Sequence, residues 1–212
     1  MDIQKINWNS KEEVLKAVRE NGLYIVYAAS EFKKDKEVLL EAIGSNSEAI
    51  REVDKSFLGD KEFMLEAVKR SNSAKNFRLD ACPLIYASDE LKQDKEFVLE
   101  VIRQNGSTLQ YADYFKQDKE VVLEAVRGNG FALEYAAEEL RGNKEVVLEA
   151  VQKSGYALMY ASFELKNDKD IVMAALNKII EDTDRAIETG EISEESREFS
   201  LYDIGEKLME DE

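Results

Sequence analysis

The sequence contains no histidine among its 212 residues, and it has a single cysteine, Cys82, and a single proline. Without histidine, the chain lacks the commonest general base and metal ligand, and neither a Ser–His–Asp nor a Cys–His catalytic group is possible. One cysteine excludes an intramolecular disulfide framework. We expect Cys82 to be a small buried or loop residue, because a nucleophilic cysteine needs a nearby lysine or helix terminus to lower its pKa. These absences favour a non-catalytic protein without a metal.

Long apolar runs are also missing. The longest stretches of consecutive apolar residues span only a few positions, whereas a helix that crosses a bilayer needs about 20. The first ten residues, MDIQKINWNS, lack the basic and apolar regions of a signal peptide. We therefore expect no membrane segment and a reducing, cytoplasmic location.

Basic residues are outnumbered by acidic ones. The chain has 29 Lys and Arg against 45 Asp and Glu, which gives a formal net charge of −16. Residues 181–212 hold thirteen of the acids and three of the bases, so most of the net negative charge lies in an acidic C-terminal cap or tail. A surface that binds nucleic acid neutralises phosphates with clustered Lys and Arg. The sequence therefore predicts no nucleic-acid binding.

What the sequence has in abundance is repetition. The motif D-K-E-V-V-L-E-A-V begins at Asp118, and related motifs begin at Ser10, Asp35, Asp60, Asp94, Asn143 and Asp168. The copies recur about every 25 residues, apart from one longer interval that holds an insertion near residues 71–83. A fixed period of this length is the signature of a tandem-repeat architecture. We number the repeats 1 to 7, and the positions within each repeat from 1 at the Ser, Asp or Asn that opens it.

Each repeat is predicted to hold two short helices. The residue at position 1 is a favoured N-cap, since its side chain can accept a hydrogen bond from a free N–H group of the first helical turn. A glycine in the left-handed conformation at position 13 would end a first helix of about ten residues. That position holds Gly22, Gly106, Gly130 and Gly155. The second helix carries the pattern L-x-Y-A-x-x-x-L, as in Leu133 to Leu140.

The first helix is apolar over most of its surface. Positions 4, 5, 6, 8 and 9 are apolar in nearly every copy, for example Val121, Val122, Leu123, Ala125 and Val126. Only positions 3, 7 and 10 form a narrow polar stripe, so we expect neighbouring repeats to flank this helix on both sides. Stacking of this kind produces an α-solenoid. A compact bundle is the alternative, which the near-identical faces of the repeats disfavour.

The predicted fold is therefore an all-α solenoid of two-helix repeats over residues 1–180, followed by the acidic segment 181–212. Trp8 and the apolar residues scattered through the acidic segment, such as Ile187 and Phe199, are expected to form helical capping segments that cover the ends of the array. The core is predicted to include Leu123, Val126, Leu133, Tyr135 and Leu148.

The consensus D-K-E-x-V-L-E-A-V-x-x-N-G-x-x-L-x-Y-A-S-x-x-L resembles the repeats of a family known as domain of unknown function 4116. The likeness covers about residues 10–176 and is strongest from Asp94 to Leu109 and from Asp118 to Leu140. Repeat 2 departs from the pattern, with Glu52 where the other repeats have tyrosine, and repeat 3 carries the insertion. The resemblance implies a helical repeat fold and no assigned activity.

Carboxylates are numerous enough for paired-acid catalysis, but their repetition argues against it. Glutamate recurs at position 7, on the polar stripe, as Glu41, Glu66, Glu100, Glu124 and Glu149. A catalytic acid is needed only once in a protein. A glutamate that recurs in every copy, with a basic residue three positions further on, is typical of a solvated helix face. The D-x-D-x-D-G pattern of a calcium loop is absent. A carboxylate-based enzyme is thus the least favoured class, and we expect no cofactor.

Tyrosine recurs at position 18, as Tyr27, Tyr86, Tyr111, Tyr135 and Tyr160. A ladder of this kind could stack bases or other ligands. Helical spacing places it beside the apolar positions 16 and 19, however. We therefore favour packed rings whose hydroxyl groups reach neighbouring loops.

Position 17 varies between repeats: it holds Val26, Arg51, Ile85, Gln110, Glu134 and Met159. We expect it to point outward together with position 21, and variation at an exposed position is where a repeat protein can encode recognition. Met159 and Phe163 stand four residues apart and predict an apolar spot on the second helix of repeat 6. Neutral variation of an exposed position is the alternative explanation.

The insertion supplies a second set of candidate binding residues. Lys69, Arg70, Lys75 and Arg78 occur with no acidic residue between them, and loops that extend from a rigid scaffold often carry function. An acidic partner would suit these bases. A loop that is tolerated without any function is the alternative.

The sequence therefore predicts a non-catalytic helical repeat module that binds a protein or peptide partner. The main alternative is a structural spacer within a larger repeat assembly. A spacer predicts that no surface patch is specialised.

Overall fold

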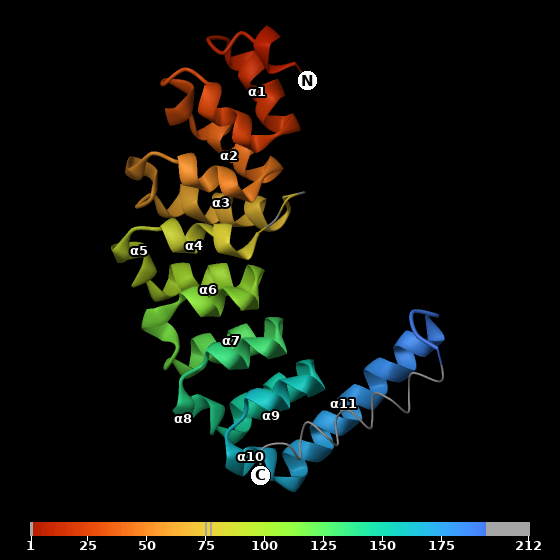
Figure 1. The fold of residues 1–212 in the computed structure, drawn as a ribbon. Helices are drawn as coiled ribbons and strands as arrows, with labels where there is room; N and C mark the ends of the chain where they lie inside the picture. The colour runs from red at the N-terminus through yellow and green to blue at the C-terminus, as the bar shows by residue number, and fades with distance from the viewer. Residues whose placement is uncertain (1, 75, 77, 194–212) are drawn as a thin grey trace. The chain divides into compact units, whose positions relative to one another are not determined.

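A computed structural model describes residues 2–74, 76 and 78–193 of the chain (Figure 1). Over these residues the regular structure consists of α-helices and 3-10 helices without a β-strand, and a single β-bridge joins Asn46 to Asn76. The predicted all-α tandem-repeat fold is confirmed. The chain divides into two compact bodies, Met1–Tyr114 and Phe115–Glu212, which are called the N-terminal and C-terminal bodies.

The N-terminal body holds repeats 1 to 4. Each repeat begins with a long helix: α1 (Lys11–Glu20), α2 (Lys36–Ser45), α3 (Lys61–Asn72) and α6 (Lys95–Gln104). Six-residue 3-10 helices follow α1, α2 and α6: η2 (Gly22–Tyr27), η4 (Ser47–Glu52) and η7 (Gly106–Tyr111). In repeat 3, η6 (Leu79–Ala81) and α4 (Pro83–Tyr86) stand in this place. The long helices pack in chain order, α1 on α2, α2 on α3 and α3 on α6 (Figure 1).

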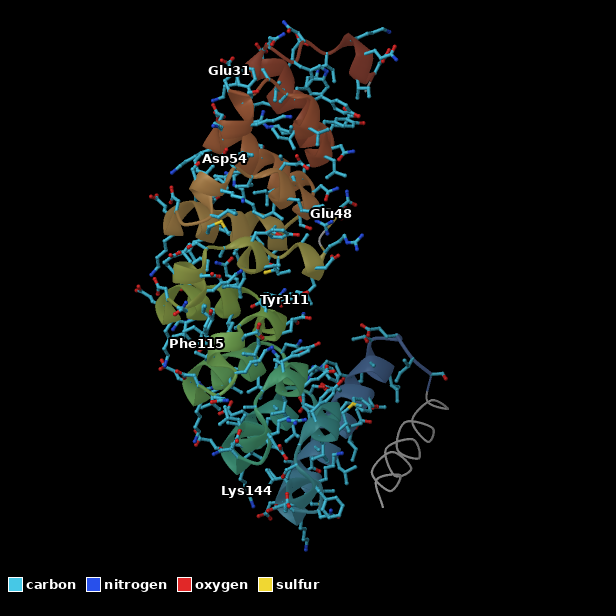
Figure 2. The ribbon with its side chains drawn as sticks, turned by 60° about the vertical axis from the view of Figure 1, so that its left-hand side comes forward. Glu31, Glu48, Asp54, Tyr111, Phe115 and Lys144 are labelled. Carbon is cyan, nitrogen blue, oxygen red and sulfur yellow. The ribbon has the colours of Figure 1, made fainter. Side chains whose placement is uncertain are left out.

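A third, shorter element completes each of these repeats: η3 (Phe32–Lys34), η5 (Lys55–Phe57), α5 (Asp89–Lys92) and η8 (Asp113–Phe115). A further short helix, η1 (Ile3–Lys5), precedes repeat 1. Figure 2 labels Glu31 and Asp54, which precede η3 and η5, on one edge of the body, and Glu48, near the start of η4, on the opposite edge.

The C-terminal body holds repeats 5 to 7. Its long helices are α7 (Lys119–Gly128), α9 (Lys144–Lys153) and α11 (Lys169–Glu188). The 3-10 helices are η9 (Gly130–Tyr135) and η10 (Gly155–Tyr160), and the short third elements are α8 (Glu138–Arg141) and α10 (Phe163–Lys166). Helix α7 packs on α9, and α9 packs on α11.

Position 1 caps the long helix in six of the seven repeats, as predicted. The Asp118 carboxylate, for example, accepts hydrogen bonds from the backbone N–H groups of Glu120 and Val121 at 3.0 and 3.3 Å. Ser10 occupies the same place with extended backbone, but its hydroxyl makes no cap hydrogen bond. The predicted length of about ten residues is also correct for most of these helices.

The predicted second helix is wrong in detail, because it is divided into a 3-10 helix and a short third element. The break follows position 18, where Ala136 and Ala161 are extended, with ψ of 150° and 162°. Ser162 then caps α10, since its hydroxyl accepts a hydrogen bond from the Leu165 N–H group at 3.4 Å. Ser88 caps α5 through Leu91 in the same way. The serine of the Y-A-S pattern is thus a helix start.

The glycine at position 13 does not take the predicted left-handed conformation. Among the described residues only Gly190 has a positive φ. The reason for glycine is the close approach of the next repeat: a Cβ atom on Gly130 would lie 2.5 Å from the carbonyl oxygen of Ala150. Gly155 faces the carbonyl oxygen of Ala175 in the same way. Position 13 is therefore a place where the backbones of successive repeats approach closely.

In repeats 2 to 6 the core is formed by positions 4, 5, 8 and 9 of the long helix. Val122 and Val126 are fully buried, as is Leu133 from the 3-10 helix. Leu123 and Leu148, which were predicted to be largely buried, are only half-buried, and so is Tyr135. Since successive residues turn by about 100°, position 6 lies about 40° from the polar position 10, at the edge of the buried face.

Lysines at position 2 connect successive repeats. The Lys61 ammonium lies 2.8 Å from the Asp94 carboxylate, which is the cap of the next long helix, and 2.8 Å from Glu96. Equivalent ion pairs join Lys11 to Asp35, Lys36 to Asp60 and Lys144 to Asp168. We call these contacts the lysine–cap ion pairs. They hold the pKa of Asp94 and Asp168 below the ordinary value.

The N-terminal end of the described chain packs on the array. The Trp8 ring lies 5.4 Å from the Tyr27 ring, and the Trp8 carbonyl accepts a hydrogen bond from the Ala29 N–H group at 3.1 Å. At the other end, residues 181–188 continue the helix of repeat 7. Gly190, with φ of 75°, ends α11 by donating to the carbonyl of Ile187 at 3.0 Å. Residues 194–212 of the predicted acidic cap lie outside the described residues.

Candidate binding face

Side chains at positions 14 and 17 share one face of each 3-10 helix. A 3-10 helix has three residues per turn, so side chains three apart eclipse each other. In η4 this brings the Arg51 guanidinium within 3.6 Å of the Glu48 carboxylate. In η7 the Gln110 amide donates to the carbonyl of Ser107 at 3.3 Å. We call positions 14 and 17, together with Ile85 at position 17 in α4, the outer face.

The outer face carries large apolar side chains at both ends of the array. In the N-terminal body, Leu23 and Val26 of η2 are 36% and 40% exposed. In the C-terminal body, Phe131 of η9 and Tyr156 and Met159 of η10 are 40%, 43% and 55% exposed. The exposure predicted for Val26 and Met159 is confirmed.

Met159 and Phe163 do not lie on one helix, contrary to the prediction. Phe163 is 61% exposed and begins α10, whereas Met159 belongs to η10. The extended backbone of Ala161 separates the two elements. The helical spacing of four residues on which the prediction relied therefore does not apply here.

Glu134 of the outer face lies near tyrosines of two repeats. Burial and, to a smaller extent, the Glu134 carboxylate raise the pKa of Tyr135 and of Tyr160. The Tyr160 ring also packs edge-on against Phe131, with 6.3 Å between ring centroids. Of the position 18 tyrosines, Tyr27 is exposed and the other four are half-buried.

A hollow of about 170 Å³ opens between repeats 3 and 4 of the N-terminal body. Its lining residues are Ile85, Lys92, Tyr111, Asp113 and Tyr114. Ile85 was a predicted binding residue, whereas Lys92, at the end of α5, was not. Gln110, another predicted residue, is half-buried beside Tyr111 on η7.

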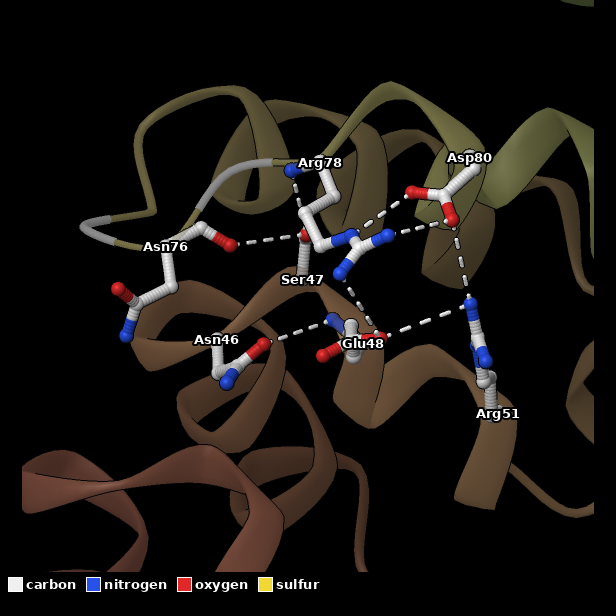
Figure 3. A network of polar contacts seen from close by, with 7 residues as sticks. All are labelled: Asn46, Ser47, Glu48, Arg51, Asn76, Arg78 and Asp80. Carbon is white, nitrogen blue, oxygen red and sulfur yellow. Dashed lines mark hydrogen bonds and ion pairs between the residues drawn. The ribbon is translucent and has the colours of Figure 1, made fainter.

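The insertion docks on repeat 2 through a polar network (Figure 3). The Ser47 hydroxyl donates to the carbonyl of Asn76 at 3.2 Å and accepts from the Arg78 N–H group at 2.9 Å. The Arg78 guanidinium forms a bidentate pair with Asp80, with both N–O distances 3.0 Å. Arg51 lies 3.6 Å from both Glu48 and Asp80, so two arginines and two carboxylates are brought together.

The positive charge predicted for the insertion is therefore largely compensated within the fold. Arg70 pairs with Glu66 at 2.7 Å and with Glu41 of the preceding repeat at 2.9 Å. Glu41 also pairs with Arg19, beside a hollow of about 270 Å³. Lys69 is exposed, and Lys75 lies outside the described residues.

Neither a reactive thiolate nor a metal-binding cluster is found among the described residues. Cys82 is buried, and burial raises the pKa of its thiol to about 11, so the thiol is protonated at neutral pH. Within the described residues, no three His, Cys, Asp or Glu side chains are grouped so that they could hold a metal ion. No described helix is long and apolar enough to cross a membrane.

Comparison with protein families agrees with the repeat pattern. A family model described as Domain of unknown function (DUF4116) matches residues 10–58, 60–114, 94–141 and 143–179. The chain belongs to this family. The four matches run through all seven repeats, so the predicted resemblance is confirmed. No curated protein and no solved structure matches the chain.

Proposed function

We propose that this DUF4116 chain is a non-catalytic module that binds a protein or peptide partner through its outer face. The observation that carries the proposal is the exposure of Phe131, Tyr156 and Met159 on 3-10 helices whose opposite sides are fully buried. Clustered exposed apolar side chains are typical of interaction sites, and aromatic residues are enriched among those that dominate binding energy.

Variation at the outer face supports the same proposal. The buried positions repeat nearly the same residues in each copy, whereas position 17 changes from Glu134 to Met159 between adjacent repeats. Side chains on this face can change without disturbing the core, because they point away from it. A rigid scaffold with variable exposed positions is well suited to recognition.

The proposal includes a cytoplasmic location and a partner other than nucleic acid. A protonated, buried thiol at Cys82 is compatible with a reducing compartment. The net charge of −16 repels a polyanion.

The experiment is to immobilise the full chain and recover proteins from an extract of the cells that make it. A double variant, Tyr156→Glu with Met159→Glu, places two charges on the outer face. We expect it to lose a protein that the wild-type chain retains. Met173→Glu is the matched control, because Met173 is 48% exposed but lies on α11.

A structural spacer is the alternative, and it makes the opposite prediction. If every recovered protein binds the wild-type chain and the double variant equally, the outer face of the C-terminal body is not the binding site. Equal loss with Met173→Glu would point to a general effect of added charge. Circular dichroism of both variants should show an unchanged helical signal, since all three side chains are exposed.

A further inference from the structure

The hollow between repeats 3 and 4 has the dimensions of a site for one side chain. Its volume is about 170 Å³, below the range of about 300–1,000 Å³ that is typical of pockets for small molecules. A single leucine or phenylalanine side chain is of the appropriate size. The hollow is therefore better suited to one anchor residue of a peptide than to a whole small ligand.

The walls of the hollow are apolar and partly exposed. Ile85 and Tyr111 are half-buried, and Tyr114 is 59% exposed. An apolar side chain that enters the hollow would remove surface from all three of these residues from water. Tyrosine rings that line a pocket are favourable anchors for binding, because they offer a large apolar area with little loss of side-chain entropy.

Lys92 supplies a positive charge that the fold does not neutralise. It is half-buried, yet its ammonium group forms no ion pair and no hydrogen bond with any residue that the structure describes. The half-buried Lys61, by contrast, pairs with Asp94 and Glu96. A partly desolvated ammonium without a counter-charge favours an incoming carboxylate. Asp113, the acid of the hollow, already has an interaction of its own.

We propose that this hollow binds an acidic peptide segment of a partner protein. An apolar side chain of the peptide occupies the space between Ile85, Tyr111 and Tyr114, and a neighbouring carboxylate pairs with the Lys92 ammonium. The inference rests on the proposed function, because Ile85 belongs to the outer face, and it names the chemistry of the partner.

The equivalent place in the C-terminal body has different chemistry. Arg141 stands two residues before the cap of the next repeat, as Lys92 does, and its Nε atom is buried without a hydrogen-bond partner. Position 17 there is Glu134 instead of Ile85, and this carboxylate contributes to the raised pKa of Tyr135 and Tyr160. An acidic peptide would meet a carboxylate at that place. Arg141→Gln is therefore a matched control for Lys92→Gln.

The test uses the full chain, labelled with ¹⁵N, and three synthetic peptides. The first is Gly-Ser-Asp-Leu-Asp-Ser-Gly with blocked ends, the second replaces both aspartates by asparagine, and the third replaces leucine by glycine. We expect the first peptide to shift the amide signals of Ile85, Lys92 and Tyr111. It should bind about three- to tenfold more tightly than the second, and the third should not bind measurably.

The variants test whether the Lys92 ammonium binds the carboxylate of the peptide. In Lys92→Gln the first and second peptides should bind equally, while in Arg141→Gln the preference for aspartate should persist. Lys92→Gln should fold normally, because the lysine has no partner to lose. Equal weakening of both peptides by Lys92→Gln would overturn the proposed pairing.

Two other results would also overturn the inference. One is the absence of any shift at the hollow with the first peptide. The other is a set of shifts confined to Tyr156 and Met159, which would leave the proposed function standing and remove this hollow from it. The proposed function itself is tested separately, by comparing the proteins that the wild-type chain and the Tyr156→Glu with Met159→Glu variant recover. It fails if the variant loses no partner.

Discussion

The Lys61 ammonium lies 2.8 Å from the Asp94 carboxylate, although the two residues are 33 positions apart in the sequence. Asp94 also accepts a hydrogen bond from the Phe97 N–H group at 3.0 Å, which caps α6. One carboxylate thus starts a helix and holds the preceding repeat. The same double role belongs to Asp60 and Asp168. Helix initiation in one repeat is thereby coupled to packing against its neighbour.

Removal of the Lys61 charge should measure this coupling. Both side chains are about one-third exposed, at 35% and 33%, so we expect Lys61→Gln to lower the free energy of unfolding only slightly. Urea unfolding of Lys61→Gln, Asp94→Asn and the double variant gives the interaction energy. Asparagine keeps the cap, which isolates the charge. An interaction energy that does not shrink in high salt would contradict an ionic coupling.

The same pair predicts a pH dependence. Lys61 is the main cause of the lowered pKa of Asp94. A carboxyl group with a depressed pKa in the folded state stabilises the fold above its ordinary pKa of about 4, and this contribution disappears as the pH falls through the folded-state value. The stability difference between the wild-type chain and Lys61→Gln should therefore be constant from pH 5 to 7 and vanish in stronger acid. A difference that grows on acidification would contradict the assignment.

The close approach at position 13 predicts a strong effect of a single methyl group. Gly130→Ala would place a Cβ atom 2.5 Å from the Ala150 carbonyl oxygen, and we expect a loss of about 1–3 kcal/mol or more in the free energy of unfolding. Gly142→Ala is the control, because the nearest atom there lies 3.6 Å away. Thermal unfolding of both variants checks the contrast. Similar melting temperatures would show that the repeats separate easily.

The partial burial of position 6 predicts unequal costs for two leucines of one repeat. Leu133 is fully buried, and its truncation to alanine should cost about 2–5 kcal/mol. Leu123 is half-buried, so the same truncation should cost less than half as much. Chemical unfolding of the two variants compares identical substitutions. A larger loss for Leu123→Ala would mean that the outer edge of the long helix is more tightly packed than the structure shows.

The buried thiol predicts a loss of stability at alkaline pH. Because the pKa of Cys82 is raised to about 11, the native thiol stays protonated, while the unfolded chain releases this proton above its ordinary pKa of about 8.5. Its contribution is present below that pKa and is lost as the pH rises towards 11, with a slope of up to about 1.4 kcal/mol per pH unit. The Cys82→Ala variant should lack this contribution to stability, whereas its other ionisable groups titrate as they do in the wild-type chain.

The measurement compares urea unfolding of the wild-type chain and Cys82→Ala at pH 7.5 and pH 10. We expect the stability of the wild-type chain to fall more steeply. Equal losses of stability in the wild-type chain and Cys82→Ala would show that Cys82 is solvated in the native state. Slow reaction of the native thiol with a thiol-specific reagent is an independent check of its burial.

Much of the repeat could be predicted because its signals are local. An N-cap such as Asp118 and the apolar positions behind it determine where a long helix begins and which side is buried. The division of the second helix was missed, although Ser162 in the Y-A-S pattern is a cap residue. Position 14 was missed for the same reason, since Phe131 and Glu134 share a face only when three residues complete a turn.

Other features depend on residues that only the fold brings together. Arg78 was expected to be part of a basic loop, but Glu48 from repeat 2 lies 3.9 Å from it, and Asp80 pairs with it directly. The lysine–cap ion pairs could not be predicted without knowing which repeats are neighbours. The hollow beside Lys92 depends on the position of Tyr111 in the following repeat, and no spacing within one repeat encodes it.

Each 3-10 helix presents its eclipsed side chains at positions 14 and 17 as one row of the outer face. The distance between the rows of adjacent repeats determines how an extended peptide would fit. Packed helices lie about 8–10 Å apart, and an extended chain advances about 3.3 Å per residue. Within one body, a peptide that crosses successive outer-face rows would thus present every third residue to a row. A motif read by two adjacent repeats would then be encoded at positions i and i+3, with the two intervening residues free to vary.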